Sequence, residues 1–103
     1  MKTPAELISE LEANREGYTT SAVIVVFESS TIVIDTNDGN RLQLLTEAMA
    51  SGGVPLAWGR TKPGKWEMAL LPEFENEPWA NDYLKKIAAI AAKHFKKGGK
   101  HAD

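Results

Sequence analysis

Two short runs between residues 23 and 36 constrain the fold most, because almost every residue in them has a β-branched side chain. The runs read VIVVFE (23–28) and TIVIDT (31–36). Val, Ile and Thr fit the pleated surface of a sheet, so both runs are predicted to be strands. The residues between them, Ser29 and Ser30, suit a tight two-residue turn poorly, and a longer loop is therefore expected.

Both faces of this predicted hairpin are apolar. If Glu28 pairs with Thr31, alternation places two sets of side chains on opposite faces. One set is Val23, Val25, Phe27, Ile32 and Ile34, and the other is Ile24, Val26 and Val33. Strands of this kind are covered on both sides by helices, or on one side by a second chain.

A helix is predicted at the start of the chain. Thr3 can cap it, Pro4 suits its first position, and Glu6 completes a capping box. We expect the helix to end at Gly17. Its apolar stripe is Leu7, Ile8 and Leu11.

The segment DTNDGN (35–40) predicts a turn followed by a second helix. It departs from a calcium-binding loop, since Gly39 is one place early and Thr46 stands where a glutamate is needed. Gly52 and Gly53 end the second helix. Its stripe is Leu42, Leu45 and Met49.

A second hairpin is predicted over residues 54–71, with its turn at Lys62-Pro63-Gly64-Lys65. Pairing Thr61 with Trp66 sets Arg60 opposite Glu67 and separates the two tryptophans by alternation. One face is expected to carry Ala57, Trp66, Met68 and Leu70, and the other Leu56, Trp58 and Leu71.

A last helix is predicted from about Pro78. Its apolar arc is Trp79, Tyr83, Leu84, Ile87, Ala88, Ile90, Ala91 and Phe95. The order is therefore αββαββα. We predict an α+β fold in which a four-stranded mixed or antiparallel sheet packs against three helices. Residues 1–97 form one domain, and 98–103 form a flexible basic tail.

Composition narrows the classes of function. A chain of 103 residues is the size of one domain, and the absence of cysteine excludes disulfides and thiolate chemistry. The chain has a net charge of -2, which is unlike the strongly basic balance of most DNA-binding domains. The first residues lack the apolar core of a signal peptide, and no run is long enough to span a bilayer, so we expect a cytoplasmic protein without membrane contact.

Catalytic and metal-binding residues are not expected. The histidines are His94, within the predicted last helix, and His101, in the tail. A metal site normally needs three or four donors, and Asp35, Asp38 and Asp82 stand in no catalytic motif. We therefore predict a non-enzymatic protein with no cofactor.

The candidate binding residues lie in the second hairpin: Trp58, Arg60, Lys62, Lys65 and Trp66. Trp and Arg dominate binding hot spots, and lysines supply charge complementarity. A purely structural interpretation stays open, in which both tryptophans belong to the core and the Arg60–Glu67 pair closes its rim.

The expected function is protein binding, as a regulator, adaptor or inhibitor, a class that includes phage-type and toxin-neutralising inhibitors. The binding surface would be the hairpin or an exposed sheet face. A homodimer is a second expectation, because the first hairpin is apolar on both faces. The alternative is a nucleic-acid-binding domain that uses the basic hairpin tip and the C-terminal lysines, Lys93, Lys96, Lys97 and Lys100.

Overall fold

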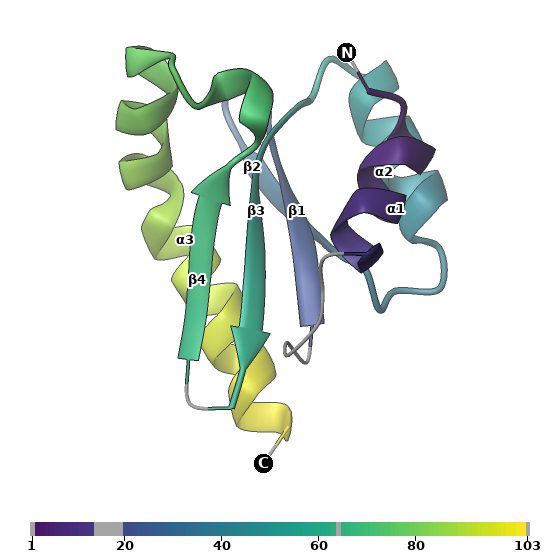
Figure 1. Cartoon of the computed structure of the whole chain (residues 1–103), viewed down its shortest axis with the longest axis vertical. Helices are drawn as coiled ribbons and strands as arrows, with labels where there is room; N and C mark the ends of the chain where they lie inside the picture. Colours follow the sequence, from purple (N-terminus) through teal and green to yellow (C-terminus); the bar gives the residue numbers. More distant parts are fainter. Residues whose placement is uncertain (1, 14–19, 64, 103) are drawn as a thin grey trace.

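The computed structural model describes residues 2–13, 20–63 and 65–102, with side chains for 2–13, 21–63 and 65–93. Three α-helices and four strands follow the predicted order αββαββα (Figure 1). The elements are α1 (Pro4–Ala13), β1 (Thr20–Val26), β2 (Thr31–Asp35), α2 (Arg41–Ala50), β3 (Val54–Lys62), β4 (Lys65–Leu70), a 3-10 turn η1 (Pro72–Phe74) and α3 (Pro78–Ala102).

The sheet is antiparallel throughout, with strand order β2-β1-β3-β4. β1 pairs with both β2 and β3, so these two strands point the same way on either side of it. The connection through α2 therefore crosses over β1. Of the two sheet types predicted, the antiparallel one is correct.

Helices cover both faces of the sheet. Figure 1 shows α1 and α2 together on one side and α3 on the other. The core beneath α1 and α2 contains Leu7, Ile8, Leu11, Val23, Val25, Ile34, Leu45, Ala48 and Leu71. The core beneath α3 contains Ala22, Ile24, Val26, Leu56, Ala57, Leu70, Ala80, Ile87 and Ala91. The two apolar faces of β1 are thus buried by helices of the same chain.

The first hairpin has a different register from the predicted one. Val26, rather than Glu28, lies opposite Thr31. The loop is longer than two residues, as expected, and the Phe27 N–H donates a 2.7 Å hydrogen bond to the Ser30 carbonyl. Because the shift is two residues, every side chain keeps its predicted face.

The second hairpin has the predicted register, with Trp66 opposite Thr61 and Glu67 opposite Arg60. The prediction is wrong for Leu56, which lies in the core beneath α3 and not with Trp58. The physical reason is an irregularity in the β1–β3 ladder between Ile24 and Val25, where Leu56 is the extra residue. The extra residue changes the alternation of β3 beyond the bulge, so Val54 also packs against the core beneath α3.

The predicted helix signals at the start of α1 and the end of α2 are confirmed. The Thr3 N–H donates to the Glu6 carboxylate at 2.9 Å, and the Glu6 N–H donates to the Thr3 hydroxyl at 3.2 Å. At the end of α2, Gly52 has a φ of +94°, and the Gly53 N–H donates to the Ala48 carbonyl at 2.9 Å. This is a Schellman ending, which favours glycine at the left-handed position. The end expected at Gly17 lies outside the described residues.

The predicted apolar stripes of α2 and α3 are only partly buried. In α2, Leu45 is buried but Leu42 is 48% exposed. In α3, Ile87 and Ala91 are buried, whereas Trp79 and Ile90 are not. Side chains from residue 94 onward, including Phe95, lie outside the described residues, and the flexible tail at 98–103 stays a prediction.

Candidate functional site

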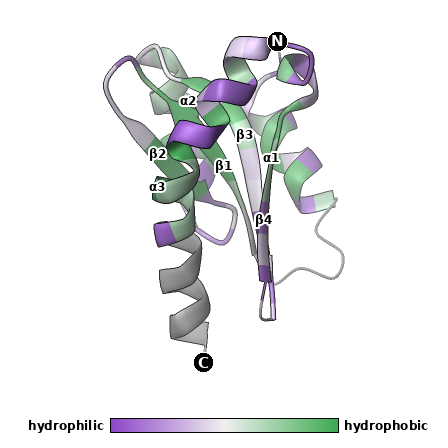
Figure 2. Ribbon diagram, turned by 90° about the vertical axis from the view of Figure 1, so that its left-hand side faces the viewer, coloured by the Kyte–Doolittle hydropathy of each residue, from purple (hydrophilic) through white to green (hydrophobic). Residues whose placement is uncertain are grey.

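Four of the five candidate residues lie on one face at the outer end of the second hairpin. Alternation along β3 and β4 places Trp58, Arg60, Lys62 and Lys65 on the side of the sheet that carries α1 and α2. We call these four residues the hairpin face. Figure 2 shows the hairpin changing from hydrophobic at its junction with the core to hydrophilic towards its tip.

The centre of the hairpin face is a stacked pair. The Arg60 guanidinium carbon lies 4.1 Å from the centroid of the Trp58 ring. Trp58 is half-buried and packs against the core beneath α1 and α2. At this distance a guanidinium is attracted by the negative ring face. The core therefore fixes the indole, and the indole orients the arginine.

The neighbouring strands continue the surface around Arg60. Ser21 of β1 lies opposite Arg60 on one side, and Glu67 of β4 lies opposite it on the other. Glu67 is the only acidic neighbour in these cross-strand positions. Towards the tip, Lys62 pairs directly with Lys65. Two lysines opposite each other repel, so the hairpin tip presents a concentrated positive charge.

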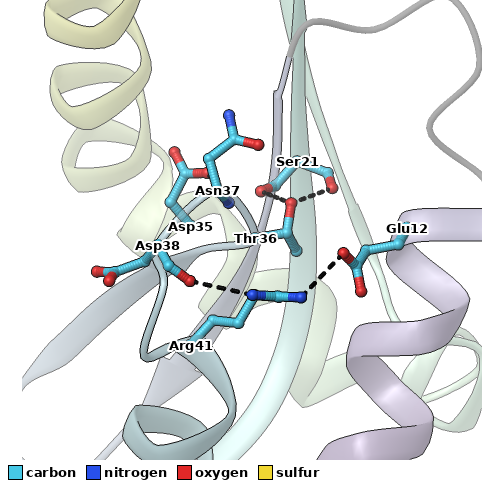
Figure 3. A network of polar contacts seen from close by, with 7 residues as sticks. All are labelled: Glu12, Ser21, Asp35, Thr36, Asn37, Asp38 and Arg41. Atoms are coloured by element: carbon cyan, nitrogen blue, oxygen red, sulfur yellow. Dashed lines mark hydrogen bonds and ion pairs between the residues drawn. The ribbon is translucent and has the colours of Figure 1, made fainter.

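A polar network lies where β1 begins and β2 ends, beside the hairpin face (Figure 3). The Thr36 hydroxyl donates to the Ser21 carbonyl at 2.8 Å and lies 2.9 Å from the Ser21 hydroxyl. Both side chains are buried. Arg41 donates to Glu12 at 3.3 Å and so links α2 to α1. The contacts tie β1, β2, α1 and α2 to one another, which indicates a structural role.

Trp66 does not belong to the hairpin face. It lies on the opposite side of the sheet, where it is half-buried and packs against the core beneath α3. The five candidate residues therefore do not form one surface. The alternation of the sequence predicts this separation of Trp58 from Trp66, and the structure confirms it.

Sequence reasoning missed two exposed apolar residues on α3. Trp79 is 50% exposed and Ile90 is 46% exposed. Both lie at one edge of the predicted apolar arc, which is wider than a helix can bury against a single sheet. That excess width was the available signal, because the residues at the edge of such an arc are the first to reach solvent.

The acidic and histidine residues are also candidate metal ligands. Among those whose side chains the structure describes, no group of three or more His, Asp or Glu could hold a metal ion. Asp35 and Asp38 accept hydrogen bonds from the backbone N–H groups of Asn37 and Asn40. These are turn contacts of the predicted kind, although the Asn40 side chain makes no cap. The side chains of His94 and His101 lie outside the described residues.

The depression found among the described residues has no set of converging polar groups at its base. This depression on α1, lined by Lys2, Ala5, Glu6, Ser9 and Glu10, is shallow and open to solvent.

No described helix has the length and apolarity to cross a bilayer. Comparison with known proteins found no matching family model, curated protein or solved structure.

Proposed function

We propose that this protein is a non-enzymatic binding domain whose hairpin face docks on an acidic surface of another protein, as a regulator, adaptor or inhibitor does. The observation that carries the proposal is the stacking of Arg60 on Trp58, 4.1 Å from the ring centroid. Arg and Trp are the residues most enriched among those that dominate binding energy. Here they are adjacent, with Lys62 and Lys65 beside them on the same face.

The stacked pair lowers the entropic cost of binding. Immobilising a flexible side chain at an interface costs about 0.5–1.5 kcal/mol. The Trp58 ring is already held by the core, and it restrains the guanidinium before a partner arrives. The stacked ring thus limits the orientations of a guanidinium, a group whose planar shape matches that of a carboxylate.

Charge supports an acidic partner. Among the paired residues of β3 and β4 that the structure describes, Arg60, Lys62 and Lys65 bring three positive charges to the hairpin face, and Glu67 brings one negative charge. The whole chain has a net charge of -2, so this region differs in sign from the molecule. A local patch of opposite sign orients an approaching partner and raises the association rate.

Nucleic acid is the second candidate partner, and the geometry of Trp58 disfavours it. Proteins that bind single strands stack bases on open aromatic faces. One face of Trp58 is occupied by Arg60, and the ring is half-buried. A base could stack there only after the arginine had moved. The C-terminal lysines that the alternative needs include Lys96, Lys97 and Lys100, whose side chains lie outside the described residues.

The test uses two lysine reversals with the same change in charge. Lys65→Glu alters the hairpin tip, and Lys85→Glu alters an exposed lysine of α3. Each variant and the wild type are used to capture partners from the native host, and captured proteins are quantified by mass spectrometry. The affinity of the recovered partner is then measured by calorimetry at several salt concentrations.

We expect Lys65→Glu to weaken capture about tenfold or more and Lys85→Glu to leave it unchanged. Surface changes of this kind alter stability by about 0.5 kcal/mol or less, and thermal melts check that both variants stay folded. Equal capture by both variants would contradict the hairpin face. Recovery of nucleic acid, with affinity falling steeply as salt rises, would favour the second candidate.

A further inference from the structure

One flank of α3 carries a row of side chains that the fold leaves partly uncovered. Trp79 and Ile90 are about half exposed. Tyr83, partly buried, and Lys86, exposed, lie between them. Steps of four, three and four residues keep these positions on one side of a helix, along about 16 Å of its length. We call Trp79, Tyr83, Lys86 and Ile90 the α3 ridge.

The aromatic side chains of the α3 ridge are held in place. The Trp79 ring meets the Phe74 ring edge-on, with centroids 5.7 Å apart and an interplanar angle of 77°. The Tyr83 hydroxyl donates a 3.4 Å hydrogen bond to the Phe27 carbonyl. Both residues therefore keep one orientation while part of the Trp79 ring faces solvent. A rigid, exposed tryptophan is typical of an interface anchor.

Charge is distributed unevenly along the same helix. Glu73, Glu75 and Glu77 are exposed just before its first turn. Lys85, Lys86 and Lys93 are exposed in its middle and later part. The arrangement follows the helix dipole, which attracts negative charge at its start and positive charge at its end. The α3 surface is thus acidic at one end, apolar along the ridge and basic towards the other end.

We propose that the α3 ridge is a homodimer interface, in which α3 packs antiparallel against α3 of a second copy. A register that sets Trp79 opposite Ile90 of the second copy also sets Tyr83 opposite Lys86. The same register brings the acidic segment before α3, with Glu73 and Glu75, towards the part of the second α3 that carries Lys93. A two-fold axis repeats each pairing. If Trp79 of one copy contacts Ile90 of the second, then Ile90 of the first copy contacts Trp79 of the second.

Every feature of the α3 ridge finds its complement in the same surface, and this argues for a second copy as the occupant. The two exposed apolar side chains cover each other. The ammonium of Lys86 meets the Tyr83 ring, a favourable cation–π arrangement. A parallel arrangement would instead set glutamates against glutamates and lysines against lysines.

The α3 ridge is independent of the hairpin face. The hairpin face lies on the side of the sheet that carries α1 and α2, whereas α3 covers the other side (Figure 1). A dimer through α3 therefore leaves both hairpin faces uncovered. A variant that no longer dimerises can still bind a partner through the hairpin face, and a variant that no longer binds the partner can still dimerise. The two proposals can therefore fail separately.

Sedimentation velocity over a concentration series tests the dimer. The chain has a mass of 11.3 kDa, and we expect about twice this mass at high concentration. Ile90→Asp buries a charge at the proposed contact and is expected to raise the dissociation constant about tenfold or more. Leu42→Asp is the matched control, because Leu42 is equally exposed but lies on α2. Circular dichroism melts confirm that both variants fold.

A charge swap tests the antiparallel register. Glu75→Lys alone and Lys93→Glu alone should each weaken the dimer, and the two together should restore it. Within one chain Lys93 lies about 22 Å along the helix from the start of α3, so restoration requires contact between copies. A wild type that stays monomeric up to about 1 mM would overturn the proposal. So would a dimer that Ile90→Asp leaves intact, or a double variant that stays as weak as the single ones.

Discussion

Gly53 is a position at which even a methyl group should strongly lower the stability. It follows the left-handed Gly52 at the end of α2, and its N–H donates to the Ala48 carbonyl. A Cβ at Gly53 would lie 2.6 Å from Cγ1 of Val25, 2.8 Å from the Ala48 carbonyl oxygen and 2.8 Å from Cζ of Phe27. Atoms do not approach this closely without one of them moving.

The expected cost follows from what would have to move. The Ala48 oxygen is backbone in the last turn of α2, and Val25 is fully buried in the central strand. Overpacking a tight site costs about 1–3 kcal/mol and occasionally more. Because the added methyl group would clash with three atoms at once, we expect Gly53→Ala to lower the free energy of unfolding by about 3 kcal/mol, the upper end of this range. For a domain of this size that corresponds to a melting temperature lower by about 12–24 °C.

Two other glycines are controls. At Gly52 a Cβ meets nothing within 4 Å, but φ is +94°, so Gly52→Ala should cost about 1–2 kcal/mol of backbone strain. At Gly39 a Cβ also meets nothing within 4 Å and φ is ordinary, so Gly39→Ala should be neutral or slightly stabilising. Urea unfolding followed by tryptophan fluorescence measures all three. If Gly53→Ala and Gly39→Ala had equal free energies of unfolding, the close packing beneath α2 would be refuted.

Three further predictions concern the core, the buried network and the first helix. Trp66→Ala should cost about 1–3 kcal/mol in urea unfolding, less than a fully buried tryptophan, because the ring is half-buried. Thr36→Val should cost about 1–3 kcal/mol because it leaves the buried Ser21 hydroxyl without its neighbour; adding Ser21→Ala should recover part of the loss, and strict additivity would argue against a coupled pair. The Thr3 N–H, and then the Thr3 side chain, lower the pKa of the Glu6 carboxyl, so its stabilising effect is present at neutral pH and is lost as the pH falls through the acid range below about 4. Thermal melts between pH 7 and 3 should therefore show a smaller acid loss for Glu6→Gln than for the wild type, and equal losses would rule out this role.

Local signals in the sequence were sufficient for most of the fold. The reciprocal bonds between Thr3 and Glu6 require only four adjacent residues, and the pairing of Lys62 with Lys65 confirms the position of the second hairpin, although Gly64 of its turn lies outside the described residues. Strand faces follow from alternation, so they stayed correct even where the register of the first hairpin was wrong. Trp58 and Trp66 were assigned to opposite faces for the same reason.

Features that depend on distant residues could not be predicted. The bulge that turns Leu56 towards α3 arises in the pairing of β1 with β3, about thirty residues away along the chain. The exposure of Trp79 and Ile90 depends on where α3 lies across the sheet, which no local pattern specifies. The stacking of Arg60 on Trp58 could not be predicted either. It depends on the strand register and on how far α1 and α2 cover the sheet.

The position of β1 has a consequence for the way this chain is synthesised. Residues 20–26 emerge from the ribosome early, but their second hydrogen-bonding partner, residues 54–62, emerges about thirty residues later. Until then the nascent strand has a bare backbone edge and two apolar surfaces, the combination that promotes aggregation. Translation speed across residues 36–53 should therefore influence the yield of native protein, and a chaperone that shields this interval should raise it.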